Sequence, residues 1–177
     1  MNCEKIAIGN DGACLETYFL GAFPDLLNSH RRPAVLICPG GAYCVCSDRE
    51  AEPIALALCA RGISAAVLRY PCAPAARFPV QLCAAAQAVA WLKGHAEENN
   101  LDPLQISIMG FSAGGHLAAS LGVFWDRPFL ARETGLSPED MRPAKLVLGY
   151  PVITSGEFIT QPSFLHLLGE EGFADAE

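Results

Sequence analysis

Short apolar runs alternate with longer segments of helical spacing along most of this chain. Four runs have the largely apolar character of strands buried on both faces of a sheet, and they cover residues 34–38, 63–70, 105–109 and 145–150. Between them, apolar residues recur at helical intervals in three segments, at about residues 50–61, 79–99 and 113–123. This alternation predicts a doubly wound, mostly parallel α/β sheet with helices on both faces.

The chain begins with a different pattern. Residues 5–8 and 15–20 have the composition of two short strands, and the turn-forming residues Asn10-Asp11-Gly12 lie between them. We therefore expect an antiparallel hairpin ahead of the parallel part of the sheet.

The first helix has two expected starting points. Ser47 and Glu50 match a capping box, which predicts a helix from about residue 50. Pro53 fits only the first turn of a helix, so in the second interpretation residues 47–52 form a separate tight turn and the helix begins near Pro53.

The last third of the chain is less regular. A polar loop is expected from the end of the third helix through Met141. Further on, Ser163 is expected to cap a short helix over residues 164–168, which Gly169 would end.

Composition fits a packed sheet and argues against some functions. The 177 residues are 51% apolar with a mean hydropathy of +0.26, and residues 1–177 are expected to form a single domain. No apolar stretch reaches membrane-spanning length and the start lacks a signal-peptide pattern, so we expect a cytoplasmic protein. A formal net charge of -7 with 12 scattered Lys and Arg argues against nucleic acid as a partner. The oligomeric state stays open, a homo-oligomer included.

The eight cysteines all precede residue 84. They contain no C-x-x-C pair and have no nearby pair of histidines, so neither a metal site nor any other cofactor is expected. Cys38, Cys59 and Cys83 fall inside apolar strand or helix patterns, where reduced cysteine acts as a small buried apolar residue.

One motif carries the candidate chemistry. Gly110-Phe111-Ser112-Ala113-Gly114 fits G-x-S-x-G between the strand 105–109 and a helix of small residues. In such a nucleophile elbow, Gly110 and Gly114 allow strand and helix to cross closely, and the strained turn exposes the Ser112 hydroxyl. The alternative is a glycine-rich turn with a solvent-facing serine.

A serine nucleophile also needs a base and hydrogen-bond donors for the oxyanion that forms on attack. The residue after the serine supplies one donor in an elbow, here the Ala113 N–H. A second donor is expected from the loop after the strand 34–38, where Gly41 and Ala42 are the candidates. An ordinary tight turn is the alternative for this loop.

Together these residues resemble the α/β-hydrolase superfamily, in its branch of acetyl-esterase-like, acetylxylan-esterase-like and hormone-sensitive-lipase-like enzymes. The likeness runs from about residue 5 to residue 153 and is carried by residues 38–43, 47–53, 68–70 and 110–118. The resemblance implies the α/β-hydrolase fold and a serine hydrolase that cleaves short-acyl or acylated-glycan esters through an acyl-enzyme on Ser112. Its substrate would be a small-molecule or glycan ester.

The chain departs from the family pattern in two ways. Pro39 and Ala42 replace the first histidine and the third glycine of the lipase-type His-Gly-Gly-Gly loop, although backbone donors survive both changes. In the family the acid and the histidine follow the serine on later strand-end loops, whereas only one strand is expected after Ser112. Because such domains have roughly 200–250 residues or more, we expect the N-terminal portion of a C-terminally incomplete domain.

The general base is not identifiable from the sequence. His30 and His95 precede the serine and are expected at the surface. His116 is carried into the protein by the elbow helix, so a packing role is expected.

His166 alone follows the elbow helix, and a triad with Asp140 or Glu157 would have a compatible chain order.

Two other functions stay open. A serine peptidase of the prolyl-oligopeptidase type shares the elbow, and a non-catalytic hydrolase-fold protein would explain the missing acid and base.

Overall fold

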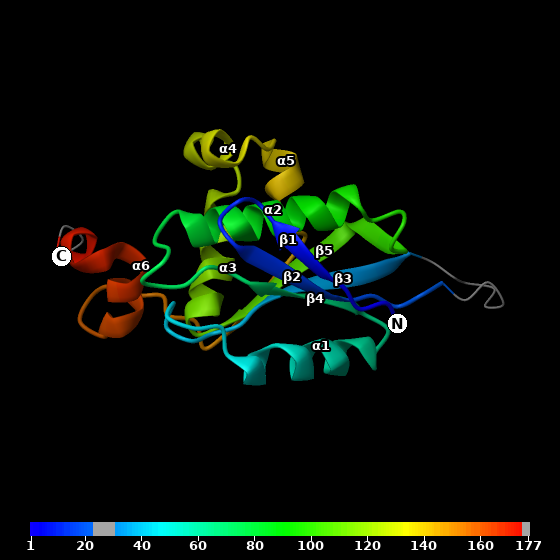
Figure 1. Cartoon of the computed structure of the whole chain (residues 1–177), viewed down its shortest axis with the longest axis horizontal. Coiled ribbons are helices and arrows are strands. Elements are labelled where there is room, and N and C mark those ends of the chain that lie inside the picture. Colours follow the sequence, from blue (N-terminus) through cyan, green and yellow to red (C-terminus); the bar gives the residue numbers. More distant parts are fainter. Residues whose placement is uncertain (23–30, 175–177) are drawn as a thin grey trace.

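The computed structural model describes residues 1–22 and 31–174 as a six-stranded sheet flanked by helices (Figure 1). In chain order the elements are β1 (Lys5–Ile8), β2 (Ala13–Tyr18), β3 (Arg32–Cys38), η1 (Asp48–Glu50), α1 (Glu52–Cys59), β4 (Ser64–Arg69), α2 (Val80–Gly94), β5 (Leu101–Phe111), α3 (Ala113–Phe124), α4 (Pro128–Thr134), α5 (Pro138–Met141), β6 (Leu146–Gly149) and α6 (Gln161–Ala174).

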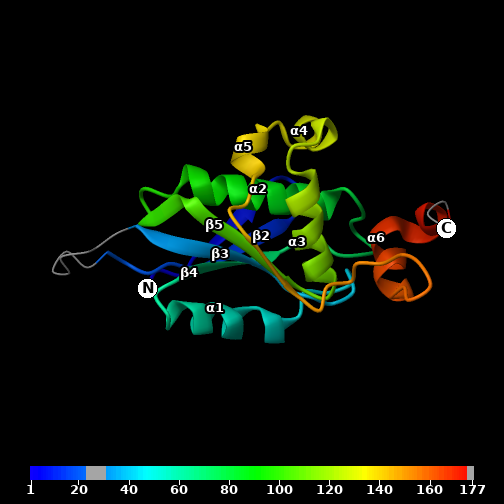
Figure 2. The same ribbon diagram turned by 180° about the vertical axis from the view of Figure 1, so that it is seen from behind.

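The strand order is β1-β2-β4-β3-β5-β6. β1 and β2 form the expected antiparallel hairpin, β2 pairs antiparallel with β4, and the other pairs are parallel. Parallel pairing places the carboxyl ends of β3, β5 and β6 at one edge of the sheet (Figure 2). The predicted mostly parallel sheet is confirmed.

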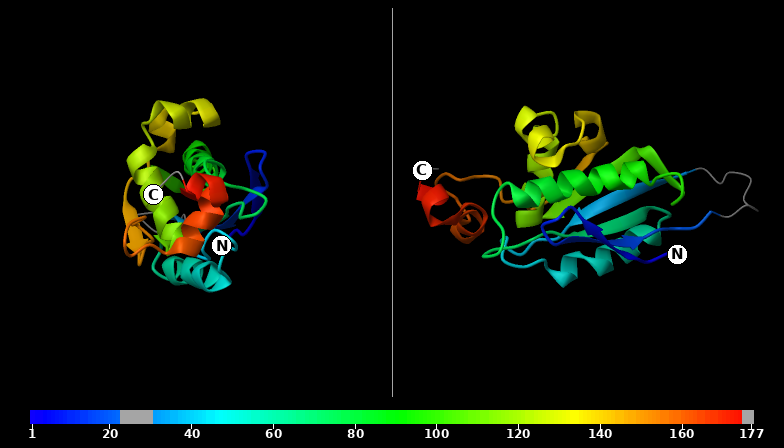
Figure 3. Two further views of the ribbon diagram at one scale, coloured as in Figure 1. Left: turned by 90° about the vertical axis from the view of Figure 1, so that its left-hand side faces the viewer. Right: turned by 45° about the horizontal axis from the view of Figure 1, so that its top comes forward.

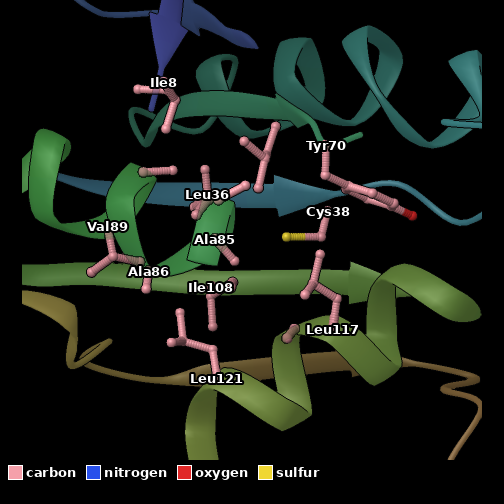
Figure 4. Packing of buried hydrophobic residues seen from close by; sticks show 14 of the residues in the cluster. Ile8, Leu36, Cys38, Tyr70, Ala85, Ala86, Val89, Ile108, Leu117 and Leu121 are labelled. Carbon is pink, nitrogen blue, oxygen red and sulfur yellow. The ribbon is translucent and has the colours of Figure 1, made fainter. Parts of the chain in front are cut away.

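Helices cover both faces of the sheet, as predicted. α1 lies on one face, and α2 and α3 lie on the other (Figures 1 and 2). Successive side chains of a strand point to opposite faces, so β3 supplies Val35 and Ile37 to the α1 side and Leu36 and Cys38 to the other. On the α2 and α3 side, the buried side chains form the larger core (Figure 4).

α6 lies beyond the carboxyl ends of the parallel strands, far from the N-terminus (Figure 3). The Phe78 N–H donates to the Leu167 carbonyl at 2.9 Å, and the Phe164 ring contacts the His116 ring edge-on at 5.5 Å between centroids. These contacts place α6 at the end of the sheet where the elbow lies.

β6 differs from the buried strand that the sequence predicts. Leu146, Val147 and Leu148 are 42%, 45% and 40% exposed, and within the described residues β6 pairs only with β5. An apolar strand with one unpaired edge is a surface at which another strand can add.

Several boundaries differ from the predictions. The Ser47 side chain makes no cap hydrogen bond, and η1 is separate from α1, so the second interpretation of the first helix is confirmed. α2 ends at Gly94 rather than near residue 99, and β5 begins at Leu101 with an irregular register next to Arg32.

The expected loop through Met141 was wrong, because it contains α4 and α5. Both begin with proline, and the Ser137 hydroxyl oxygen accepts the Asp140 N–H at 3.3 Å as an N-cap. The short helix expected over residues 164–168 is part of α6, which starts at Gln161 and is interrupted at Gly169 by a φ of 80°.

The core on the α2 and α3 side can be tested within β5. Ile108 is fully buried, whereas Leu104 of the same strand is 84% exposed. Ile108→Ala is expected to lower the free energy of unfolding by about 2–5 kcal/mol, measured by urea titration. Leu104→Ala is the control and should change it by no more than about 0.5 kcal/mol. Equal effects of the two substitutions would contradict this core.

Candidate active site

Ser112 lies at the turn between β5 and α3 with a strained backbone. Its φ of 51° and ψ of -118° are unfavourable for a residue with a side chain and cost about 1–3 kcal/mol. Neighbouring strand-end residues hold the turn: the Ser112 N–H donates to the Gly149 carbonyl at 3.0 Å, and the Val152 N–H donates to the Ser112 carbonyl at 3.1 Å. The half-buried Ser112 hydroxyl makes no hydrogen bond within the described residues.

Glycines are required on both sides of this turn by close packing. A Cβ on Gly110 would collide with the Gly114 carbonyl, and a Cβ on Gly114 would collide with the carbonyls of Cys38 and Pro39. The beginning of α3 therefore lies directly on the ends of β5 and β3. This geometry is the strand-to-helix crossing that the G-x-S-x-G motif predicts.

The loop after β3 contains three successive residues of positive φ: Gly41 at 131°, Ala42 at 52° and Tyr43 at 60°. A Cβ at residue 41 would collide with the Val45 carbonyl, so only glycine fits there. The N–H groups of Cys44 and Val45 donate to the Gly41 carbonyl at 3.0 and 3.2 Å, which closes the loop on itself.

The three predicted oxyanion donors are unoccupied within the described residues. No acceptor there is bonded to the N–H groups of Gly41, Ala42 or Ala113. The loop also touches the nucleophile, because a Cβ on Gly40 would lie 3.0 Å from the Ser112 Cβ. Free donors on both sides of a serine are what an oxyanion site needs.

Residues of η1 and of the end of β4 form hydrogen bonds and an ion pair that hold the loop after β3. Arg69 at the end of β4 pairs with Asp48 of η1 at 2.9 Å and donates to the Cys46 carbonyl at 3.3 Å. The buried Tyr70 hydroxyl donates to the Pro39 carbonyl at 2.5 Å. Residues 39, 48 and 69–70, which are far apart in sequence, thus meet beneath the loop.

His116 has the packing role expected from the sequence. Its Nδ1 lies 2.7 Å from the hydroxyl of the buried Tyr43, and its ring packs edge-on against Tyr43 and Phe164. Burial lowers the pKa of His116 below the usual 6.5. Its ring therefore joins α3 to the glycine loop and is not bonded to Ser112.

The order-compatible triad is not assembled in the described residues. The His166 Nδ1–H donates to the Ala42 carbonyl at 2.8 Å, because a carbonyl can only accept. Asp140 accepts a hydrogen bond from the Ser137 hydroxyl at 2.6 Å, and Glu157 is exposed.

Two histidines remain. His95 is at the surface, stacked on Trp91 with ring centroids 4.1 Å apart. His30 lies outside the described residues.

Sequence reasoning missed Glu50 and Tyr150. Glu50 was interpreted as the glutamate of a capping box, but its Oε2 accepts the Gly40 N–H at 2.7 Å. Its Oε1 accepts a hydrogen bond from the Tyr150 hydroxyl, also at 2.7 Å. The sequence signal for this bond was an acidic residue ten positions after Gly40. It was interpreted as part of a helix capping box instead.

The cysteines of the described residues are free thiols, and the Cys44 thiol donates to the Gly41 carbonyl of the glycine loop at 3.2 Å. Cys38 and Cys83 are buried free thiols as expected, whereas Cys59 is half-buried. In residues 1–22 and 31–174, no three His, Cys, Asp or Glu side chains gather where they could hold a metal ion. Across the same ranges, no helix is both long enough and apolar enough to cross a bilayer.

The close crossing at the elbow can be tested at Gly114. Gly114→Ala forces a methyl group into the carbonyls that end β3, so the free energy of unfolding should fall by about 1–3 kcal/mol or more. Gly94→Ala is the matched control, because no atom lies within 4 Å of a Cβ there. Thermal unfolding measures both. A Gly114→Ala protein as stable as the Gly94→Ala protein would contradict the crossing.

Burial of His116 predicts a pH dependence of stability. Below pH 6.5 the unfolded chain binds a proton at this histidine while the folded protein resists it, so stability falls as the pH drops from 6.5 toward the folded pKa. Each unit of pKa difference corresponds to about 1.4 kcal/mol. His116→Gln should lose less stability between pH 7.5 and 5.5 in urea titrations. A pKa of 6.5 or above for His116 in the folded protein, measured by NMR, would show that burial of this imidazole does not cause the pH dependence.

Comparisons with known proteins show which family the chain resembles. The family model described as BD-FAE matches residues 24–146. The chain is 35% identical over 147 residues to endo-1,4-beta-xylanase B of Butyrivibrio fibrisolvens, an overlap of 78% of this chain and 22% of that protein. It is 30% identical over 144 residues to the acetylxylan esterase of Xylanibacter ruminicola, covering 80% of this chain and 27% of that one.

Solved structures give the same result. MGS-M1, an alpha/beta hydrolase enzyme from a Medee basin deep-sea metagenome library, is 42% identical with a TM-score of 0.76, over 89% of this chain and 60% of that one. The acetyl ester-xyloside bifunctional hydrolase of Caldicellulosiruptor lactoaceticus is 34% identical with a TM-score of 0.76, over 90% and 56%.

These overlaps show how much of the similar proteins the chain represents. It spans about a quarter of the length of the two curated relatives and about 60% of the two solved chains. The matching family model covers well over half of the 177 residues and includes the elbow and the glycine loop. The chain belongs to the BD-FAE family, and its fold is that of the α/β hydrolases.

Proposed function

We propose that this chain supplies the nucleophile and the oxyanion donors of a serine hydrolase that cleaves carboxylic esters. The observation that carries the proposal is the strained Ser112 at the strand-to-helix crossing, with unoccupied N–H groups at Ala113 and in the glycine loop. Gly110 and Gly114 form the elbow, and Gly41, Ala42 and Ala113 are the proposed donors.

In the proposed reaction, the Ser112 Oγ attacks the ester carbonyl carbon while its proton passes to a base. The tetrahedral oxyanion accepts hydrogen bonds from the Ala113 N–H and from the loop N–H groups of Gly41 and Ala42. Collapse breaks the bond to the alcohol, which leaves with a proton, and an acyl-enzyme stays on Ser112. Water then releases the acid and restores the serine.

We further propose that the substrate is a short-acyl ester, such as an acetyl group on a glycan. Support comes from the names of similar proteins, which include an acetylxylan esterase and an acetyl ester-xyloside hydrolase. The negative formal charge of the chain gives no reason to expect a polyanionic substrate.

A non-catalytic hydrolase-fold protein is the second candidate. It is favoured by one observation: within the described residues, no histidine is bonded to Ser112. Without its base, a site of this kind retains only the smaller rate enhancement from binding and oxyanion stabilisation, roughly 10³–10⁴-fold over water in a serine protease.

Covalent labelling decides between the two candidates. A fluorophosphonate should phosphonylate Ser112 of the 177-residue chain, located by peptide mass spectrometry, and Ser112→Ala should abolish the adduct. Ser120→Ala is the control, because Ser120 is a half-buried serine further along α3. An adduct that persists in the Ser112→Ala protein would rule out Ser112 as the nucleophile, and no adduct at all would support the non-catalytic candidate. Rates on short acyl esters and on peptidyl amides then separate an esterase from a peptidase.

A further inference from the structure

The carboxylate of Glu50 joins two loops at the nucleophile. Its Oε2 accepts the Gly40 N–H from the loop after β3, and its Oε1 accepts the Tyr150 hydroxyl from the loop after β6. Both donor-to-acceptor distances are 2.7 Å, in the range of strong charge-assisted hydrogen bonds. Glu50 is half-buried, and its bond to the buried Gly40 is partly protected from water, whereas its bond to Tyr150 is exposed.

Gly40 is wedged between this carboxylate and the elbow. A Cβ on Gly40 would lie 2.7 Å from the Glu50 Oε2, 2.8 Å from the Phe111 carbonyl and 3.0 Å from the Ser112 Cβ. Any shift of Glu50 away from this position leaves space on one side of Gly40. The next residues, Gly41 and Ala42, would move with it.

The loop beyond Gly40 needs such an anchor. Three consecutive residues of positive φ store strain of about 1–3 kcal/mol for each residue that carries a side chain, and two of them do. The bonds within the loop fix its internal shape. Its later residues are held from outside, because Tyr43 is bonded to His116 of α3 and the Ala42 carbonyl accepts from His166, whereas Glu50 holds its beginning at Gly40. The Glu50 bond ties it to η1, which Arg69 in turn fastens to β4 through Asp48.

A role for Glu50 in capping a helix is excluded by its partners. In a capping box the glutamate would accept the N–H of Ser47, but that N–H donates to the Gly40 carbonyl at 2.8 Å. Both carboxylate oxygens point instead to the loops that border the nucleophile.

We propose that Glu50 is the positioning residue of the oxyanion site: it holds Gly40 against the elbow so that the N–H groups of Gly41 and Ala42 face the carbonyl attacked by Ser112. The Tyr150 hydroxyl bonds to the same carboxylate and so connects the loop after β6 to Glu50. The inference rests on the proposed function, because the oxyanion site itself is proposed.

The bond to Tyr150 gives a readout that does not depend on activity. The pKa of Tyr150 is raised above 10, first by its hydrogen bond to Glu50, with burial and the negative charge of Glu50 adding to the shift and Arg49 opposing it. Glu50→Ala should return the phenol pKa toward 10 in an ultraviolet titration. Glu52→Ala is the matched control, because it removes an exposed carboxylate two residues away.

The decisive experiment combines NMR with phosphonylation kinetics on the 177-residue chain. Glu50→Ala should shift the amide signals of residues 40–42 and slow Ser112 phosphonylation by about 10- to 100-fold, less than the roughly 10²–10³-fold measured for deleting an oxyanion donor. Glu50→Gln keeps an acceptor oxygen and should recover most of the rate, because a neutral hydrogen bond is about half as strong. Tyr150→Phe should leave the Gly40 signal in place. Glu52→Ala should match the unsubstituted protein in every measurement.

Each outcome separates the two proposals. If the unsubstituted protein is labelled and Glu50→Ala is labelled equally fast, or if the amides of residues 40–42 do not shift, the positioning role is overturned while the proposed function stands. If Ser112 is never labelled, the proposed function is overturned, and the amide spectra still decide whether Glu50 holds the loop. If Glu50→Ala does not fold, Glu50→Gln replaces it: a small shift of the residue 40–42 amides with a slightly slower phosphonylation supports the positioning role, and amides and a rate identical to those of Glu52→Ala overturn it.

Discussion

The rest of the site depends on one packing constraint, the crossing of α3 over the ends of β3 and β5. Gly110 and Gly114 have no room for side chains because each abuts a backbone carbonyl. This closeness forces Ser112 into its strained conformation, which the carbonyl of Gly149 and the N–H of Val152 hold in place. Close packing between backbone segments thus places the Ser112 side chain at the end of a buried sheet.

The same edge of the sheet gathers the other components. Because β3, β5 and β6 run parallel, the loops that follow them meet at their carboxyl ends, where open α/β sheets bind ligands. One loop supplies free N–H groups, the second carries the serine, and the third begins at Tyr150. The Glu50 carboxylate bonds to both the first and the third, so a single charged side chain connects Gly40 with Tyr150, which lies 100 residues after Glu50.

Much of the architecture could be predicted from the sequence. Continuous apolar runs identify β3 and β4 because those strands are buried on both faces, and they identify β5, whose buried residues alternate with half-buried ones. The glycine spacing identifies the elbow because only glycine fits such close contacts. α4 and α5 were missed because they are short and stabilised by proline starts and one serine cap, with little apolar periodicity.

Other features were outside the reach of local patterns. The bond of Glu50 to Gly40 depends on how two loops fold against each other, and the local pattern at Glu50 matches a helix cap equally well. The exposure of Leu146, Val147 and Leu148 depends on what pairs with β6, which an apolar run does not reveal. His166 followed the expected chain order, but its bond to the Ala42 carbonyl is a tertiary contact without a sequence signature.

The central claim is that the elbow and the glycine loop form one oxyanion site around Ser112. A crystal structure of the phosphonylated chain tests it most directly, because the phosphoryl oxygen occupies the place of the oxyanion. The account predicts that this oxygen lies about 2.7–3.1 Å from the Ala113 nitrogen and from the nitrogen of Gly41 or Ala42. A phosphoryl oxygen directed to solvent, with these N–H groups unbonded, would contradict it.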